Sequence, residues 1–306
     1  MSESFRDPNS PAPEFPTLRP DVLRRALMAP RGPIPRLEVV DEIPSTQSAL
    51  VQAVREDPDE WPDMSVIAAS HQTQGRGRSG RDWVTPRGAV TASIVLRPEN
   101  IDVMRWSWIP LLAGLAAVRA VRKVAKLPET GLKWPNDVVI DVPDASEVPG
   151  WGTLRKLGGV LTEIVPDPAG GRKPLGAVVG FGINVAQTPE ELPVEWAGSL
   201  ASVGSPGVDP SVLLTSVLRS TTRRHVLWGE HEGAMHSTGL AALVRDACVT
   251  IGQEITVDLP GGEQLRGVAD GLDMAGHLVV RTETGDIRTI FAGDVRNVRG
   301  VESTQE

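Results

Sequence analysis

The spacing of the apolar segments changes near residue 250, and this change constrains the possible folds more than any other feature. Before it, strand-length apolar runs alternate with segments whose apolar residues recur at helical spacing, as from Leu111 to Val121. After Gly252, short alternating runs such as Ile255 to Leu259 are separated by glycine turns about ten residues apart. The pattern predicts a larger domain of strands and helices, followed by a small β-barrel.

The chain divides into three segments on this basis, with the main boundary expected between residues 248 and 253. Residues 1–36 are rich in proline, serine and aspartate, so they are expected to form a disordered or weakly ordered tail. Within this tail, Asp21 to Met28 has the composition of a short helix that prolines isolate on both sides. Residues 37–248 form the predicted main domain, and residues 249–306 form the barrel with a short tail.

The charge and cysteine content exclude several classes of protein. The 306 residues carry a formal net charge of -8, which argues against a nucleic-acid-binding surface over the whole protein. The single cysteine, Cys248, allows neither an intramolecular disulfide nor a cysteine-based metal cluster. No apolar run reaches the roughly 18 residues of a membrane span, and the first residues lack the pattern of a signal peptide. We therefore expect a cytoplasmic protein that does not enter membranes.

The arginine loop, Gly75-Arg76-Gly77-Arg78-Ser79-Gly80-Arg81, is the most unusual local feature of the sequence. Glycines let a backbone bend tightly and present N–H groups to a ligand. Arginines supply several donors in a fixed geometry to carboxylate and phosphate oxygens. The loop therefore predicts a cover over an anionic ligand. By itself it fits a flexible or nucleic-acid-binding Arg-Gly segment equally well, and it is neither a P-loop nor a Rossmann fingerprint.

Two further segments carry a lysine next to an apolar strand. Lys133-Trp134-Pro135-Asn136-Asp137 is a predicted turn, which can present Lys133 to phosphate and Asp137 to a positive group or hydrated Mg²⁺. Lys156 stands at the mouth of a strand whose two glycines indicate the close approach of a ligand or of another backbone. It can hold a reacting carboxylate and a phosphate together, although a single lysine at a strand end is most often only solvated.

The strand Val178 to Val185 carries glycines at alternate positions. Gly180 and Gly182 share one face, which leaves a flat floor on which a ring can lie, and Asn184 points the same way. A buried glycine-rich strand without a ligand is the structural alternative. The histidines show no metal-ligand spacing, and the sequence contains no nucleophile elbow.

Taken together and in this order, these segments resemble the biotin protein ligases over roughly residues 37–300. The pairing of the arginine loop with the Trp-Pro-Asn-Asp turn is the most specific part of the resemblance. It implies an α+β fold of the class II aminoacyl-tRNA synthetase and biotin ligase type: a mixed β-sheet packed with helices, and a small C-terminal SH3-like β-barrel. It also implies a two-step reaction. Biotin and ATP with Mg²⁺ give biotinyl-5′-AMP, which a lysine of a biotin carboxyl carrier domain of acetyl-CoA carboxylase then attacks.

The resemblance implies roles for particular residues. The residues expected to bind biotin are Ser45, Thr46, Gln47, Gln72, Arg76, Gly77, Arg78, Lys156, Gly180 and Gly182. The residues expected to bind ATP are Arg78, Arg81, Trp83, Lys133, Asn136, Asp137 and Asn184. Lys156, Arg78 and Asp137 are the expected catalytic residues. Lys156 and Arg78 are the cationic donors expected to stabilise the charge that develops when a carboxylate attacks the α-phosphate, and Asp137 is expected to serve ATP and Mg²⁺. Mg²⁺ is expected to accompany ATP, near Asp137.

The chain departs from the family pattern in three places. Gln47 stands where family members commonly have asparagine, which affects one expected contact with the biotin ring. The segment 141–155 is longer than is usual in the family, and it is expected to form a surface insertion. The short proline-rich N-terminus does not match the DNA-binding domain of the family's repressor members, so we expect a monofunctional ligase that does not bind DNA.

Two alternatives stay open. One is a lipoate-type protein ligase, which shares this fold and chemistry, and the other is a biotin-sensing, nucleic-acid-binding repressor. The arginine loop and the C-terminal barrel favour biotin, and the acidic composition argues against the repressor. The sequence also leaves open whether the protein forms a homodimer.

Overall fold

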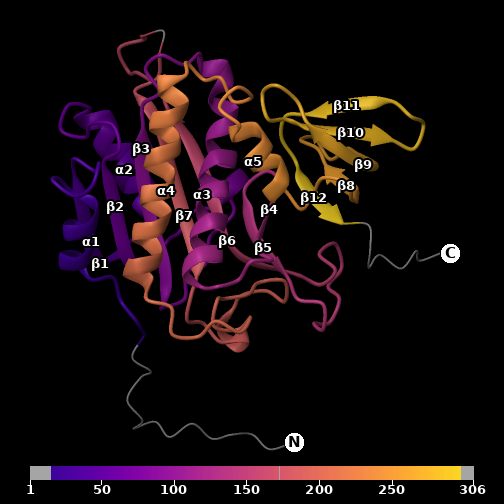
Figure 1. Cartoon of the computed structure of the whole chain (residues 1–306), viewed down its shortest axis with the longest axis horizontal. Helices are drawn as coiled ribbons and strands as arrows, with labels where there is room; N and C mark the ends of the chain where they lie inside the picture. Colours follow the sequence, from indigo (N-terminus) through magenta and orange to yellow (C-terminus); the bar gives the residue numbers. More distant parts are fainter. Residues whose placement is uncertain (1–14, 172, 298–306) are drawn as a thin grey trace, which may run out of the picture.

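The computed structural model describes residues 15–171 and 173–297. The larger domain is built on a seven-stranded sheet with the order β1-β2-β3-β7-β6-β5-β4 (Figure 1). β1 and β2 run parallel, and every other neighbouring pair runs antiparallel, so the sheet is mixed as expected. The strands are β1 (Leu37–Ile43), β2 (Val66–Gln72), β3 (Ala89–Leu96), β4 (Gly131–Lys133), β5 (Asp137–Asp141), β6 (Leu154–Val165) and β7 (Gly176–Asn184).

Helices cover both faces of this sheet, because alternate residues of a strand point to opposite sides. In β2, Val66 and Ala68 face the larger core beneath α3 and α4, whereas Ile67 faces a smaller cluster beneath α2. Figure 1 shows α3 and α4 side by side across the sheet. The helices are α1 (Pro20–Leu27), α2 (Thr46–Glu56), α3 (Ile109–Val124), α4 (Pro210–Glu230) and α5 (Leu240–Ala247), with short 3₁₀ turns η1 (Arg78–Gly80), η2 (Val103–Trp108) and η3 (Pro189–Glu191).

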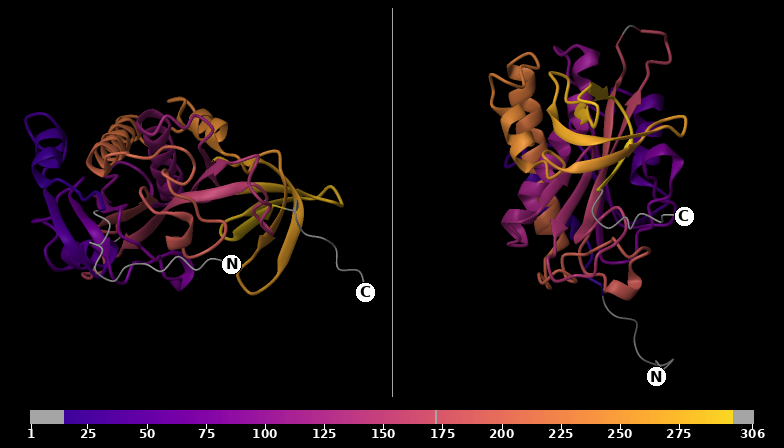
Figure 2. Two further views of the ribbon diagram at one scale, coloured as in Figure 1. Left: turned by 90° about the horizontal axis from the view of Figure 1, so that it is seen from below. Right: turned by 90° about the vertical axis from the view of Figure 1, so that its right-hand side faces the viewer.

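The C-terminal domain follows α5 and forms a five-stranded antiparallel sheet with the order β11-β10-β9-β8-β12. In Figures 1 and 2 this domain lies beyond α5, next to β4 and β5. The N–H of Val249 donates to the carbonyl of Leu132 at 3.0 Å, and Trp108 Nε1 donates to the carbonyl of Met274, also at 3.0 Å. These bonds attach the domain to the larger sheet. Its strands are β8 (Glu254–Asp258), β9 (Gln264–Leu272), β10 (Leu278–Thr282), β11 (Ile287–Ile290) and β12 (Asp294–Asn297).

The segment from residue 15 to residue 36 is packed against the larger domain, so the expected disordered or weakly ordered tail is wrong for this part. The expected short helix is present as α1, which packs on α4 and buries Leu23 and Leu27 completely. Pro20 stands in the first turn of α1, where backbone N–H groups have no partner within the helix, so its missing N–H costs no hydrogen bond. The proline content thus concealed how this helix packs against α4 rather than the helix itself. Residues 1–14 of the expected tail, and residues 298–306 at the other end, lie outside the described residues.

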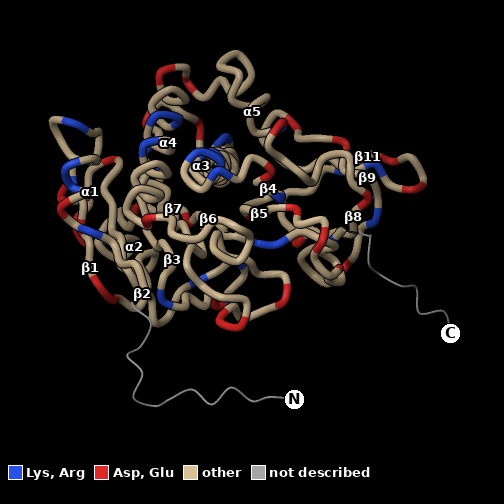
Figure 3. The backbone as a smooth tube through the Cα atoms, turned by 60° about the horizontal axis from the view of Figure 1, so that its bottom comes forward, with Lys and Arg blue, Asp and Glu red and all other residues tan. Residues whose placement is uncertain are grey.

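None of the helices in the described residues is both long and apolar enough to cross a bilayer. Figure 3 shows acidic as well as basic residues on both domains.

Candidate active site

A cavity of about 680 Å³ lies where the arginine loop and the 133–137 turn meet the sheet and the C-terminal domain. β6 and β7 form its floor, and residues from the start of α2, the arginine loop and β12 line its walls. Every residue to which the sequence analysis assigned a role in binding or catalysis lines this cavity. The fold therefore brings into one place side chains that are widely separated along the chain.

One end of the cavity is a buried network of uncharged polar groups. Ser45 caps α2 by accepting a hydrogen bond from the N–H of Ser48, at 3.3 Å. Thr46 donates to Gln72 Oε1 from its backbone N–H at 2.8 Å and from its hydroxyl at 3.0 Å. The same hydroxyl lies 2.9 Å from Ser93 Oγ. Donors and acceptors fixed in this way suit a neutral polar ring.

Gln47, the residue that departs from the family pattern, belongs to this network. Its side chain is buried, and Nε2 donates to the carbonyl of Val178 at 3.1 Å. Ser93 Oγ donates to Gln47 Oε1 at 3.3 Å. A Cβ atom on Gly180 would lie 2.7 Å from Gln47 Oε1, so the Gln47 amide in this position packs directly against the backbone of Gly180. The pair Gln47 and Gly180 thus shapes this end of the cavity.

The glycine floor predicted for β7 is covered by a side chain of the protein itself. A Cβ atom on Gly182 would lie 2.6 Å from the indole of Trp83, so Trp83 rests directly on the backbone of β7. The centroid of this ring is 5.2 Å from Lys156 Nζ. Asn184 is buried and donates from Nδ2 to the carbonyl of Gly198 at 2.9 Å. Trp83 therefore lies between the polar end and the charged middle of the cavity.

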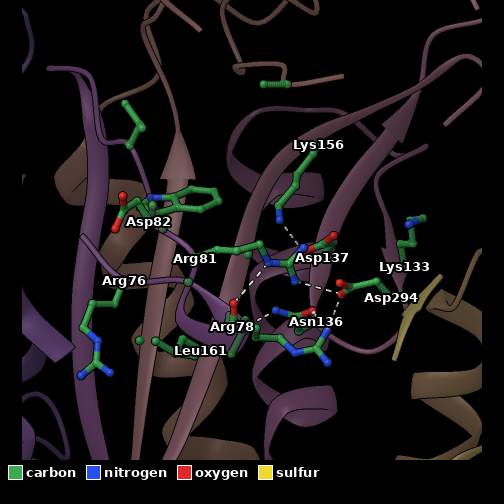
Figure 4. Close-up of a pocket in the computed structure, with 18 of the residues that line it drawn as sticks. Arg76, Arg78, Arg81, Asp82, Lys133, Asn136, Asp137, Lys156, Leu161 and Asp294 are labelled. Atoms are coloured by element: carbon green, nitrogen blue, oxygen red, sulfur yellow. Dashed lines mark hydrogen bonds and ion pairs between the residues drawn. The ribbon is translucent and has the colours of Figure 1, made fainter. Parts of the chain in front are cut away.

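The middle of the cavity holds a cluster of charged groups, shown in Figure 4. Lys156 Nζ lies 2.7 Å from Asp137 Oδ1, because the antiparallel pairing of β5 with β6 places the two side chains together. Arg78 Nη1 donates to Asn136 Oδ1 at 3.2 Å. Burial lowers the pKa of Arg78, and the carboxylates of Asp294 and Asp137 oppose this shift. Two cations, Lys156 and Arg78, are therefore held by neighbouring residues of the same turn, Asp137 and Asn136.

The backbone of the arginine loop forms a closed hairpin. The N–H of Gly77 donates to the carbonyl of Arg81 at 2.7 Å, and that of Trp83 donates to the carbonyl of Gly75 at 2.9 Å. A Cβ atom on Gly75 would lie 2.3 Å from the carbonyl oxygen of Trp83, so this position requires glycine. Gly75 thus permits the close backbone approach that closes this hairpin.

The arginine side chains point in two directions. Arg81 Nη2 lies 2.9 Å from Asp294 Oδ1, and Arg78 Nη1 lies 3.6 Å from the same oxygen. Both guanidinium groups therefore reach β12 of the C-terminal domain. Arg76 points away from this cluster in Figure 4, and its Nη1 lies 3.8 Å from Glu163 Oε2 at the rim. Arg78 and Arg81, rather than Arg76, face the charged middle of the cavity.

The other end of the cavity is aromatic and cationic. Lys133 Nζ donates to the carbonyl of Val295 and lies 4.2 Å from the ring centroid of Trp151. Trp151 stacks on Trp196 with 5.9 Å between ring centroids and 8° between planes. Burial lowers the pKa of Lys133 to about 8, with the Asp137 carboxylate opposing the shift. This lysine therefore gives up its proton more readily than an exposed lysine does.

Several residues that line the cavity carried no expected role, among them Ser93, Asp294, Trp151 and Trp196. Ser93 had a usable signal, since it is a polar residue inside an apolar strand. No comparable signal marks the other three residues. Asp294 belongs to the C-terminal domain, Trp151 to the insertion between β5 and β6, and Trp196 to the connection between η3 and α4. The insertion at 141–155 was expected to lie on the surface. It is not confined there, because its Trp151 lines the cavity. A tryptophan in a polar insertion does not by itself indicate where its ring lies.

The order of these groups defines the class of protein. A neutral polar end suits a ring, a cluster of cations in the middle suits a carboxylate beside a phosphate, and a further lysine suits a phosphate chain. Such a cavity is the site of an enzyme that joins a carboxylic acid to a nucleotide.

Comparison with known proteins agrees with this class. The chain matches the Biotin/lipoate A/B protein ligase family over residues 39–184, and the Biotin protein ligase C terminal domain over residues 250–296. It is 34% identical to the biotin–[acetyl-CoA-carboxylase] ligase of Mycobacterium tuberculosis, over 86% of this chain and 90% of that one. It is 28% identical to the ligase of the same name from Paracoccus denitrificans, over 72% of this chain and 85% of the relative.

The fold agrees with that of solved ligases. The biotin protein ligase of Aquifex aeolicus, in complex with biotin and ATP, superposes with a TM-score of 0.67 at 26% identity, covering 86% of this chain and 100% of that one. The chain belongs to the biotin protein ligase family.

Proposed function

We propose that this protein is an ATP-dependent biotin–protein ligase. It converts biotin to biotinyl-5′-AMP and transfers the biotinyl group to a lysine of the biotin carboxyl carrier domain of acetyl-CoA carboxylase. The observation that carries the proposal is the order of groups along one cavity: the Thr46–Gln72 network, then Lys156 with Arg78, then Lys133. The similarity to ligases named for acetyl-CoA carboxylase supports the choice of carrier.

The first step joins two anions. An oxygen of the biotin carboxylate attacks the α-phosphorus of ATP, the bond to the β-phosphate oxygen breaks, and pyrophosphate leaves. We assign Lys156 and Arg78 to the carboxylate and the α-phosphate, because cations placed in advance stabilise the charge that grows there. Asp137, at 2.7 Å from Lys156 Nζ, keeps the ammonium oriented. Lys133 holds the phosphate chain.

The second step needs no nucleophile from the protein. The uncharged amine of the carrier lysine attacks the acyl carbonyl, the bond to the phosphate oxygen breaks, and AMP leaves as the amide forms. The mixed anhydride must be shielded from water until the carrier arrives. We assign this role to the arginine loop, whose closed hairpin places Arg78 and Arg81 over the charged middle of the cavity.

Mg²⁺ fits this site as a companion of ATP. The ion usually keeps one or two carboxylates and takes its remaining ligands from substrate phosphates and water. Within residues 15–171 and 173–297, no cluster of three or more His, Cys, Asp or Glu side chains could hold a metal alone. We assign Asp137 to the ion, which would neutralise phosphate charge when bound.

The enzyme acts, in our proposal, in the cytoplasm and without binding DNA. Its net charge of -8 opposes the counterion release on which nucleic-acid binding depends. Retention on a DNA column at moderate salt, with a steep decrease as salt rises, would contradict this part of the proposal.

A transfer assay tests the function directly. The protein is incubated with ATP, labelled biotin and a carrier domain, and the mass of the carrier is measured. We expect the mass of one biotinyl group to be added only when ATP is present, and no addition to a carrier whose target lysine is replaced by arginine. Transfer of lipoate at a comparable rate would instead identify a lipoate-type ligase.

A further inference from the structure

We propose that Trp151, in the hairpin connection 142–153, is a positioning residue for ATP that acts through Lys133. This inference rests on the proposed function, which assigns Lys133 to the phosphate chain. Trp151 belongs to the insertion between β5 and β6, and its ring stands at the end of the cavity opposite the Thr46–Gln72 network.

The hairpin is folded so that its tip returns to the cavity. The N–H of Val148 donates to the carbonyl of Gly152 at 2.9 Å, and the N–H of Trp151 donates to the carbonyl of Val148, also at 2.9 Å. Gly150 and Gly152 have φ angles of +75° and +58°, a conformation that favours glycine. The two glycines that flank Trp151 thus make the tight turn that presents its ring.

Contacts on three sides hold this tip in place. The ring of Trp151 stacks on Trp196, and Lys133 Nζ lies 4.2 Å from the Trp151 centroid. On the third side, the carbonyl of Gly150 accepts a hydrogen bond from the N–H of Asn297 in β12, at 2.9 Å. The insertion therefore joins the larger domain to the C-terminal domain at the position of Lys133.

The kind of contact that Lys133 makes matters for its role. Lys156 is held by a carboxylate at 2.7 Å, whereas Lys133 is held by an aromatic face and a carbonyl oxygen. An aromatic face orients an ammonium without cancelling its charge. Trp151 thus fixes the direction of Lys133 and leaves its positive charge available to phosphate oxygens.

Substitution of Trp151 tests the role through the separate KM values of the two substrates. We expect Trp151→Ala to raise the KM for ATP about tenfold, the scale of one desolvated cation–π contact, and to leave the KM for biotin unchanged. Trp151→Phe keeps an aromatic face and should restore most of the affinity for ATP. Glu147→Ala, an exposed position in the same hairpin, is the matched control and should behave as wild type.

A double-mutant cycle separates this role from a structural one. If Trp151 acts through Lys133, Trp151→Ala should have little further effect on the ATP KM in a Lys133→Ala background. A tenfold effect in that background would overturn the proposal, as would an unchanged ATP KM in the single variant or an equal rise in the biotin KM. If Trp151→Ala does not fold, Trp151→Leu keeps the apolar volume and takes its place. Absence of transfer by the wild-type protein would refute the proposed function instead.

Discussion

At the scale of single residues, the site contrasts two lysines in different surroundings. Lys156 pairs with Asp137 at 2.7 Å in the middle of the cavity, where the carboxylate orients its ammonium group. Lys133 is buried against Trp151 and a backbone carbonyl, and its pKa falls to about 8. The two residues should therefore respond differently to substitution.

Lys156→Ala should abolish adenylation. The variant loses a preorganised cation that we assign to the transition state. Removal of one preorganised donor from an enzyme active site reduces kcat about 10²- to 10³-fold. Release of pyrophosphate from ATP in the presence of biotin measures this step without the carrier. If the release stayed near the wild-type rate, Lys156 would have no role in the first step.

The affinity for ATP should fall as pH rises through about 8, the lowered pKa of Lys133. Burial disfavours the ammonium, so the charge that binds phosphate is present below this pH and is lost above it. The KM for ATP, measured between about pH 7 and 9, should therefore rise. Lys133→Arg stays charged throughout this range and should remove the rise. A parallel rise in the KM for biotin would point to a different titrating group.

At the scale of elements, the arginine loop and α1 show how short segments acquire structure from their neighbours. The loop is closed by two backbone hydrogen bonds, and its arginines are held by side chains of other elements. α1 has only eight residues, too few for a stable isolated helix, and it depends on packing against α4.

Replacement of Arg78 by glycine should loosen the cover over the intermediate. The variant removes the donor to Asn136 and the contact with Asp294. We expect biotinyl-5′-AMP to escape faster, as measured by its appearance in solution after rapid filtration. Arg76→Gly, in the same loop but directed toward Glu163, is the control and should retain the intermediate better. Equal retention by wild type and Arg78→Gly would count against the covering role.

Truncation of Leu23 in α1 should destabilise the whole larger domain. The side chain is completely buried, and replacement of a buried leucine by alanine costs about 2–5 kcal/mol. Urea unfolding should therefore show a lower midpoint for Leu23→Ala, whereas the exposed neighbour Arg24→Ala should change little. An unchanged midpoint for Leu23→Ala would mean that α1 is not part of the cooperative unit.

At the scale of the whole molecule, the C-terminal domain completes the site. Asp294 of β12 contacts Arg81 at 2.9 Å and Arg78 at 3.6 Å, and the backbone of the next residue accepts from Lys133. The domain therefore supports both the arginine loop and the end of the cavity that holds Lys133.

Asp294→Asn should weaken the hold of the C-terminal domain on the arginine loop. We expect faster hydrogen exchange over residues 75–83 and faster escape of biotinyl-5′-AMP, while the fold stays intact. Asp270→Asn breaks a pair with Arg281 that lies wholly within the C-terminal domain, at 2.6 Å, and serves as the control. If hydrogen exchange over residues 75–83 were equally fast in both variants and in wild type, Asp294 would not restrain the loop.

Much of the site was predictable because its residues have strong local requirements. Gly75 must be glycine for the loop to close, and the strand containing Gly180 and Gly182 permits the close approach of side chains. These requirements leave a pattern in the sequence. The packing of residues 15–36 was not predictable, because two buried leucines among prolines give too weak an apolar pattern.

The sequence by itself determined the family and a group of side chains that line the cavity, because glycines, arginines and strand-end lysines carry their chemistry in local spacing. Only the tertiary structure decided which distant groups complete the cavity: Asp294 from the C-terminal domain, and Trp151 stacked on Trp196 beside Lys133. Their contacts join segments far apart along the chain. They depend on how the domain and the hairpin pack against the sheet, and no local pattern encodes that packing.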